Sequence, residues 1–255
     1  LTRMSRCRFA RFLGRRAAEP TVQMMLALTA PTAMIPVGVA LLLLLGNGVC
    51  AVVNLRTSGA RGADWIVIAL GWGMAVFVGA SVADPSGGHL NPAVTLMLAV
   101  NGSLEWSLVP YYALGQILGA MVGAFLAWAA FKQLFDANNV DEAGNTTGAN
   151  ATTGGIFFTN PAHPNNGWNA VTEFIATCVL LMFIAFGPTG GELGPLSYFG
   201  VAFVVVAVGL SLGTPTGYAI NPARDLGPRI AHAILPIPGK GGSDWAYSWV
   251  PVVGP

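Results

Sequence analysis

The chain contains the same tripeptide twice, at Asn91-Pro92-Ala93 and at Asn221-Pro222-Ala223. Asn caps helix N-termini well, and Pro fits the first helical position, where no backbone donor is needed. Each copy follows a glycine-rich turn and opens a short apolar run, at 91–100 and 222–235. Such runs are too short to cross about 30 Å of hydrocarbon as helices. The repeated motif therefore predicts two short helices that enter a membrane and turn back.

The composition requires a membrane setting. The chain is 54% hydrophobic and only 9% charged, whereas soluble domains carry about 25% charged residues. Five apolar stretches are candidate membrane spans, at 35–53, 65–83, 108–131, 171–187 and 196–212. A sixth begins near Trp245, and the sequence stops at Pro255. We expect an all-α membrane protein with six tilted helices and two re-entrant half-helices. The sixth helix is truncated, either because the sequence is a fragment, which we favour, or because that helix never completes.

The spans and short helices fall into two matching halves. We divide a single channel domain, 34–255, into a first repeat at 34–135, a linker at 136–169 and an incomplete second repeat at 170–255. The linker is rich in Asn, Thr, Gly and Pro, which is typical of a solvent-exposed segment. Because three spans separate the halves, their topologies are inverted. Paired interruptions in inverted halves indicate a site near the middle of the bilayer.

Residues 1–33 form an arginine-rich extension that we interpret as a cytoplasmic anchor at the lipid bilayer. The alternative of a nucleic-acid partner is not favoured. With the N-terminus in the cytoplasm, the first motif dips in from the cytoplasm and the second from outside, so that the short helices meet with their N-termini facing each other.

This meeting point has a definite chemistry. We expect each Asn side-chain oxygen to cap its own helix, leaving the two amide groups to donate to one passing oxygen. The helix N-termini carry partial positive charge, which repels cations. A water held by both amides aims its hydrogens away, which interrupts proton relay. Three His and three Cys residues lie scattered along the chain, so no metal site, cofactor or catalytic group is expected.

Four ionisable residues lie at or near membrane depth. Arg224 stands where the first motif has Val94, and a charge there indicates function. Glu173, within the fourth span, is expected to accept hydrogen bonds from a re-entrant loop. Asp225 has Arg229 four residues further on as its expected partner. A proton-coupled transporter needs a second buried carboxylate, and the matching place in the first span holds Ile35.

Residues 86–95 and 217–225, which contain the two motifs, resemble the major intrinsic protein family of aquaporins and glycerol facilitators. The resemblance implies six helices and two half-helices around a pore, assembled as a homotetramer, with His89 beside the pore. It places the narrowest point at Trp72, Gly209, Tyr218 and Arg224. Gly71 is an alternative to Trp72, because the stretch from 72 to 91 is one residue shorter than usual.

Within that family the resemblance favours the glycerol-conducting branch. Water-selective members place a His where this chain has Gly209, and Asp225 follows Arg224 as in glycerol channels. We expect a passive channel in the cell membrane for glycerol, other small neutral solutes and water, which excludes ions and protons. The alternatives are a water-selective channel and a coupled secondary transporter.

Overall fold

A computed structural model describes residues 32–187 and 196–255, and helices are the regular elements of these residues. The arginine-rich residues 1–31 lie outside the described residues. The helices are α3 (Ile35–Asn54), α4 (Trp65–Val82), η1 (Asp84–Ser86), α5 (Pro92–Val100), η2 (Trp106–Leu108), α6 (Val109–Ala130), α7 (Lys132–Asn138), η3 (Ala149–Thr152), α8 (Gly154–Phe157), α9 (Asn166–Phe186), α11 (Ser197–Leu212), α12 (Pro222–Ile234) and α13 (Val250–Val253).

Four helical stretches among the described residues are long and apolar enough to cross a membrane: Ile35–Asn54, Trp65–Val82, Trp106–Ala130 and Asn166–Phe186. The fifth expected span, α11, has 16 residues and is therefore about 24 Å long. The predicted bounds are close except for α9, which begins five residues early. Asn165 caps it by accepting a hydrogen bond from the Trp168 amide, and this capping signal lies outside the apolar run.

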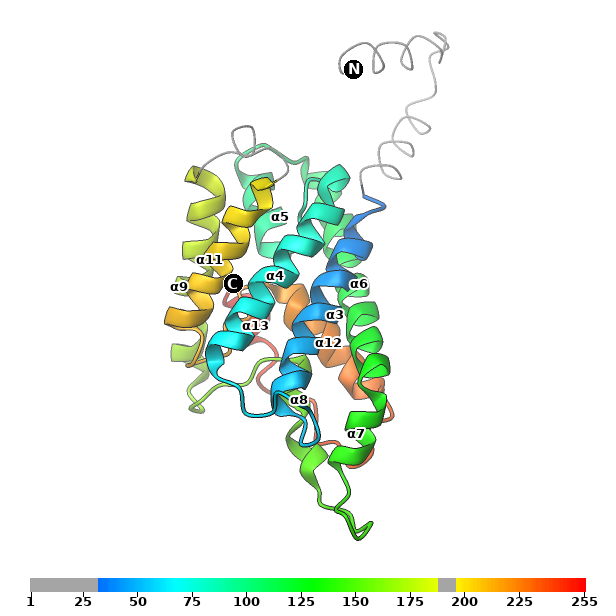
Figure 1. The fold of residues 1–255 in the computed structure, drawn as a ribbon. Helices are drawn as coiled ribbons and strands as arrows, with labels where there is room; N and C mark the ends of the chain where they lie inside the picture. The colour runs from blue at the N-terminus through cyan, green and yellow to red at the C-terminus, as the bar shows by residue number, and fades with distance from the viewer. Residues whose placement is uncertain (1–31, 188–195) are drawn as a thin grey trace, which may run out of the picture.

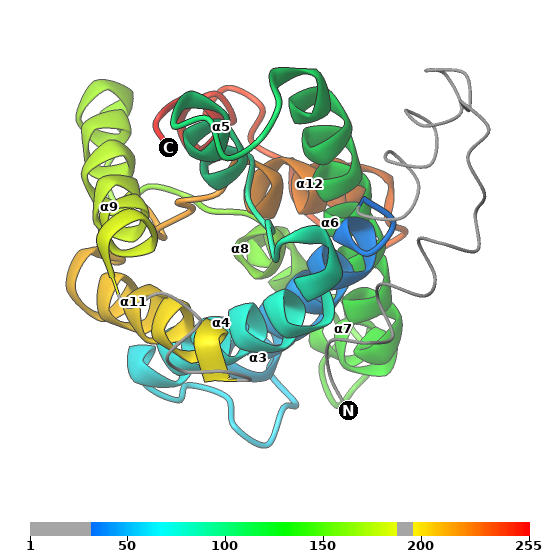
Figure 2. The same ribbon diagram turned by 90° about the horizontal axis from the view of Figure 1, so that it is seen from above.

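The long helices stand side by side in a curved row, in the order α9, α11, α4, α3 and α6. Figure 1 shows them running roughly parallel, and Figure 2 shows the row curving around the centre of the molecule. The half-helices α5 and α12 both pack against α6 and touch each other. In Figure 1, α5 lies in the upper half and α12 in the lower half, as two inverted halves require.

Glycines allow α3 and α6 to approach closely. A Cβ atom added at Gly119 would lie 2.4 Å from the Pro36 carbonyl oxygen, and one at Gly123 would lie 2.4 Å from that of Ala40. Small residues spaced four positions apart let two helix backbones pack closely. Helices in a membrane associate in this way, because the hydrophobic effect does not drive their association there. This contact fixes α6, and α6 in turn supports both half-helices.

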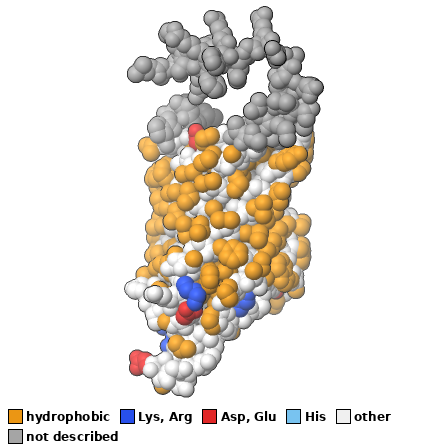
Figure 3. Space-filling model, turned by 90° about the vertical axis from the view of Figure 1, so that its right-hand side faces the viewer, with side chains coloured by type: hydrophobic (Ala, Val, Ile, Leu, Met, Phe, Trp, Pro, Cys, Tyr) orange, Lys and Arg blue, Asp and Glu red, His pale blue; other side chains and the backbone are white. Residues whose placement is uncertain are grey.

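The outer surface suits a bilayer. Large apolar side chains such as Leu118, Val122 and Phe174 are exposed on the long helices. Figure 3 shows hydrophobic side chains covering most of one face, with charged side chains gathered toward its lower end. The band matches the hydrocarbon-facing surface that the composition predicts.

Residues 136–169 differ in part from the exposed linker that their composition predicts. They contain the end of α7, η3, α8 and the start of α9, and Ile156, Phe157 and Phe158 are buried. Two buried polar residues of the segment bind within the protein, because Asn138 donates to Asn150 and Asn150 donates to the carbonyls of Phe135 and Pro238. The exposure that the composition predicts holds for residues 142–148 and 162–165, whereas the burial of 156–159 was not predicted.

At the C-terminal end, α13 is a helix of four residues that packs against α9 and α12. Val250 and Pro251 are buried there. The apolar stretch that begins near Trp245 is thus helical over Val250–Val253.

Replacing Gly119 by Ala tests the α3–α6 contact. We expect a clear loss of thermal stability, because the added methyl group meets backbone atoms of α3, and overpacking costs about 1–3 kcal/mol. Gly115→Ala is the matched control, since its nearest neighbour would lie at 3.6 Å. Melting temperatures measured in detergent compare the two variants; equal values would show that the contact does not constrain the fold.

Candidate functional site

The two Asn-Pro-Ala motifs meet inside the protein. Asn91 caps α5 by accepting a hydrogen bond from the Ala93 amide, and Asn221 caps α12 by accepting from the amides of Ala223 and Arg224. Pro92 and Pro222 occupy the first helical positions. Both Asn residues adopt the extended backbone that an N-cap requires.

The Asn amide groups do more than the expected donation to a passing solute. Asn91 Nδ2 donates to the Ile220 carbonyl oxygen at 2.7 Å, and Asn221 Nδ2 donates to that of Leu90 at 2.9 Å. Each amide carries two hydrogens, so one ties the loops together and one remains for the cavity that both residues line. The prediction was incomplete because it counted each amide as a single donor.

The loop before α12 is strained and anchored by a carboxylate. Tyr218 and Ile220 adopt φ angles of 39° and 42°, in the left-handed region that side chains disfavour. Glu173, fully buried on α9, accepts from the amides of Ala219 at 3.0 Å and Ile220 at 2.9 Å. These contacts are those expected of a carboxylate that satisfies a re-entrant loop.

The loop before α5 is held by neutral groups from α6. Gln116 donates to the His89 carbonyl oxygen at 2.9 Å, and Tyr112 donates to that of Ser86 at 3.1 Å. The His89 ring packs against Tyr112, with ring centroids 5.0 Å apart, and also lines a cavity. The sequence analysis did not identify Gln116 or Tyr112, because neither lies near the motif along the chain.

Two cavities share part of their lining. The first, of about 140 Å³, is lined by both motif loops, including His89, Asn91 and Asn221. The second, of about 300 Å³, is lined by residues such as Trp65, Thr159 and Thr214. The residues that line both cavities are Trp72, Tyr218 and Arg224. These are three of the four residues that the family resemblance placed at the constriction.

Among these shared lining residues, the guanidinium of Arg224 lies on the face of the Trp72 ring. The Arg224 guanidinium carbon is 3.8 Å from the centre of the Trp72 ring, and Arg224 Nη1 donates to the Phe157 carbonyl oxygen at 3.3 Å. Trp72 Nε1 donates to the Cys50 sulfur at 3.4 Å. Gly71, the alternative to Trp72, faces Val49 of α3, since a Cβ there would meet that side chain at 2.7 Å.

Gly209 has no side chain and so leaves room for the ring of Tyr218. It lies behind Tyr218, since a Cβ at 209 would come within 2.8 Å of the Tyr218 ring. Trp65 donates to the Gly209 carbonyl oxygen at 2.7 Å and packs edge-on against Tyr218. Gly209 itself lines neither cavity. The space that a His side chain would take at this position is filled by the Tyr218 ring.

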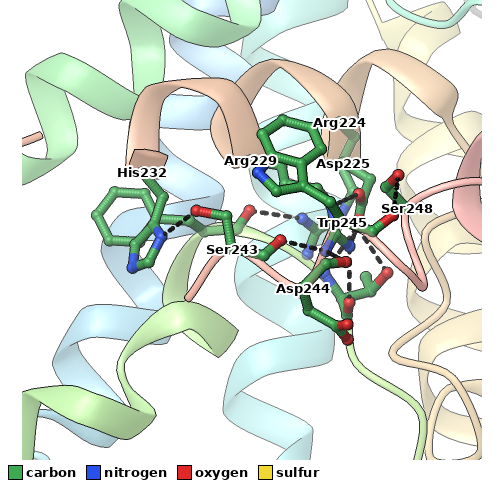
Figure 4. A network of polar contacts seen from close by, with 10 residues as sticks. Arg224, Asp225, Arg229, His232, Ser243, Asp244, Trp245 and Ser248 are labelled. Carbon is green, nitrogen blue, oxygen red and sulfur yellow. Dashed lines mark hydrogen bonds and ion pairs between the residues drawn. The ribbon is translucent and has the colours of Figure 1, made fainter. Parts of the chain in front are cut away.

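The neighbouring charges of α12 form a separate network, shown in Figure 4. Asp225 pairs with Arg229, the partner expected from the spacing, at 2.7 Å, and both side chains are fully buried. Asp225 also accepts from the amide and hydroxyl of Thr159. Thr159 lies in the segment that the sequence analysis assigned to an exposed linker.

The model of the major intrinsic protein family matches residues 28–255. The chain belongs to this family. It is therefore an integral membrane protein with the helical fold of that family, in which α5 and α12 are the two half-helices.

Curated relatives match most of the chain. It is 48% identical over 222 residues to a probable glycerol uptake facilitator protein of Thermotoga maritima, covering 86% of this chain and 90% of that protein. It is 46% identical over 221 residues to the glycerol uptake facilitator protein of Bacillus subtilis, covering 86% and 77%. Among solved structures, the aquaglyceroporin from Plasmodium falciparum superposes with a TM-score of 0.72 at 28% identity, covering 88% of each chain.

Glu173→Gln tests the anchor of the second loop. Gln keeps the size of the side chain but presents an amide donor to one of two backbone donors, so that a buried hydrogen bond is lost. We expect a stability loss of about 1–3 kcal/mol together with a lower solute flux. Glu105→Gln, at an exposed position, is the control, and an unchanged melting temperature for Glu173→Gln contradicts the anchoring role.

Proposed function

We propose that this chain forms a passive transmembrane pore for glycerol, other small neutral solutes and water, and that it excludes ions and protons. The observation that carries the proposal is that Trp72, Tyr218 and Arg224 line two cavities at once. An aromatic wall facing guanidinium donors suits a solute with a carbon backbone and hydroxyl groups. The names of the relatives, glycerol uptake facilitators in two bacteria, agree with this solute class.

Ion exclusion follows from the proposed path. A solute that crosses from one cavity to the other meets the Arg224 guanidinium and, beside the motifs, the N-termini of α5 and α12. The partial positive charge of those termini disfavours cations. The remaining N–H groups of Asn91 and Asn221 donate to a solute oxygen, so a water held there is oriented and does not relay a proton.

The proposed setting is the cell membrane, with the N-terminus in the cytoplasm and four copies assembled as a homotetramer. The arginines near the N-terminus support this orientation under the positive-inside rule. The proposed transport needs no cofactor and no covalent step, so we assign no enzymatic activity to the chain.

Two other functions give different fluxes. A water-selective channel passes water and retains glycerol, whereas a coupled transporter moves solute only with a sodium or proton gradient. The volume of the second cavity, about 300 Å³, and the names of the relatives favour a glycerol channel over a water-selective one. Glu173 is used in binding backbone amides, which disfavours a proton-carrying role.

The test is solute uptake by liposomes that contain the purified protein. We expect glycerol gradients to collapse faster than in protein-free liposomes, without any sodium or proton gradient. Water flux without glycerol flux would identify a water-selective channel, and flux that needs an ion gradient would identify a coupled transporter.

Gly209→His tests the constriction itself. The imidazole displaces the Tyr218 ring toward the pore, because even a Cβ at 209 lies within 2.8 Å of that ring. A barrier raised by about 1 kcal/mol slows glycerol about fivefold, with a smaller effect on the smaller water molecule. Stopped-flow light scattering measures both fluxes, and Gly155→His, on the wall of the wide second cavity, is the control. Equal losses of both fluxes in Gly209→His would argue against the assignment.

A further inference from the structure

The first cavity is lined by more than the three residues that it shares with the second. Its lining includes Gly87, Gly88 and His89, from the turn before α5, and Tyr198 near the start of α11. These residues do not line the second cavity. A solute that crosses the first cavity along the proposed path therefore passes a second set of side chains after it leaves Arg224.

Tyr198 lies far along α11 from the residues that both cavities share. Gly209, on the same helix, lies against the ring of Tyr218. Positions 198 and 209 are eleven residues apart, which corresponds to about 16 Å along an α-helix. In Figure 1 the yellow start of α11 lies near the top of the row of helices. Tyr198 and Tyr218 are therefore found beside different ends of α11, and the first cavity reaches from one to the other.

A hydrogen bond holds the Tyr198 ring at this end of the cavity. Tyr198 Oη donates to Asp84 Oδ1 at 2.8 Å, which joins α11 to η1 across 114 positions of the chain. The ring lies against Gly88, because a Cβ added there would meet the Tyr198 hydroxyl oxygen at 2.7 Å. Gly88 has a φ angle of 67°, so a residue without a side chain suits both this turn and the ring beside it. The ring is thus fixed from two sides, by the carboxylate and by the turn.

Apolar side chains of α5 and α11 line the first cavity together with Tyr198. Leu98 lies two helical turns beyond the Asn91 cap, and Val201 lies one turn beyond Tyr198. A solute hydroxyl group that leaves the amides of Asn91 and Asn221 meets these side chains, and a hydroxyl group without a hydrogen-bond partner is costly in apolar surroundings. An aromatic ring beside such a wall forms a barrier that grows with the size of the solute and with its number of hydroxyl groups.

We propose that Tyr198 is a specificity-determining residue that forms a second barrier to solutes, at the end of the first cavity away from Arg224, and that Asp84 is the positioning residue that holds its ring there. The inference rests on the proposed function, because it assigns the first cavity to the path of the solute. The ring limits the passage of solutes larger than glycerol, and water, the smallest permeant, is affected least.

The experiment compares the permeability of liposomes containing the protein to water, to glycerol and to erythritol, a linear polyol one carbon longer than glycerol. We expect Tyr198→Ala to raise erythritol permeability about fivefold, glycerol permeability by less and water permeability least, because removal of the ring widens this end of the cavity. Tyr198→Phe keeps the ring and loses the hydrogen bond, so a smaller change in the same order is expected from a protein that packs as the wild type does.

Asp84→Ala removes the acceptor of this hydrogen bond and leaves the ring in place. We expect it to match Tyr198→Phe, and we expect the double variant to show no further change, because both substitutions break the same contact. Additive effects of the two substitutions would show that Asp84 does not act through Tyr198, and would overturn the positioning role of the carboxylate.

The matched control is Tyr111→Ala. Tyr111 also lies in the first turn of a long helix, α6, but it is 53% exposed and lines neither cavity. Its removal should leave the three permeabilities in their wild-type ratio. A purely structural role for Tyr198 lowers the amount of folded channel and therefore scales all three permeabilities together. An unchanged ratio of erythritol to water permeability in both Tyr198→Ala and Tyr198→Phe overturns the inference.

A last arm asks whether the barrier at Tyr198 is separate from the one near Arg224. Barriers in series add their resistances, which are the reciprocals of the permeabilities. Tyr198→Ala should therefore lower the resistance to glycerol by the same amount in a Gly209→His background as in the wild type. An equal fold-change of permeability in both backgrounds would indicate one shared barrier and would overturn the inference alone. A wild-type protein that passes no glycerol overturns the proposed function and, with it, this inference.

Discussion

Two hydrogen bonds between the re-entrant loops fix the centre of this protein. Asn91 donates to the Ile220 carbonyl oxygen and Asn221 donates to that of Leu90, while each Asn oxygen caps its own half-helix. Because every polar atom of both side chains has a set direction, the helix N-termini must face each other at one depth. An unsatisfied backbone group at that depth costs several kcal/mol, so the loops, their anchors and the helices that carry the anchors are constrained by this contact.

Local signals in the sequence were sufficient for the half-helices and the spans. Asn at the N-cap and Pro at the first helical position are consecutive residues, so the sequence shows them directly. The length of an apolar run likewise shows whether it can span a membrane. The anchors of the loops were predictable only in part. Glu173 stood out because a carboxylate in an apolar span needs a partner, whereas Gln116 and Tyr112 are uncharged and their partners lie 26 or 27 residues away.

The buried residues within 136–169 show what composition does not predict. Asn, Thr and Gly are typical of exposed loops because their polar groups need partners that water usually supplies. Here Asn138 and Asn150 bind each other, and Asn150 also binds two backbone carbonyls. The Thr159–Asp225 contact joins residues 66 positions apart. Such partners are set by tertiary packing, which local sequence patterns do not reveal, so the burial of residues 157–159 was not predicted.

Both halves of the protein contain a re-entrant loop followed by a half-helix, but their buried side chains differ in charge. The first loop is held by the neutral Gln116, whereas the second half carries two carboxylates, Glu173 and Asp225, and two guanidiniums, Arg224 and Arg229. Their formal charges cancel, so this cluster as a whole attracts neither cations nor anions. What remains along the pore is directional: hydrogen-bond donors from Arg224 and the two Asn amides, and the partial positive ends of two helices. A neutral hydroxyl group can accept from these donors without leaving a charge unsolvated, whereas an ion loses its hydration and finds no net counter-charge. In the proposed pore, selectivity for neutral solutes thus follows from the cancellation of charge together with the remaining donors of Arg224 and the two Asn residues.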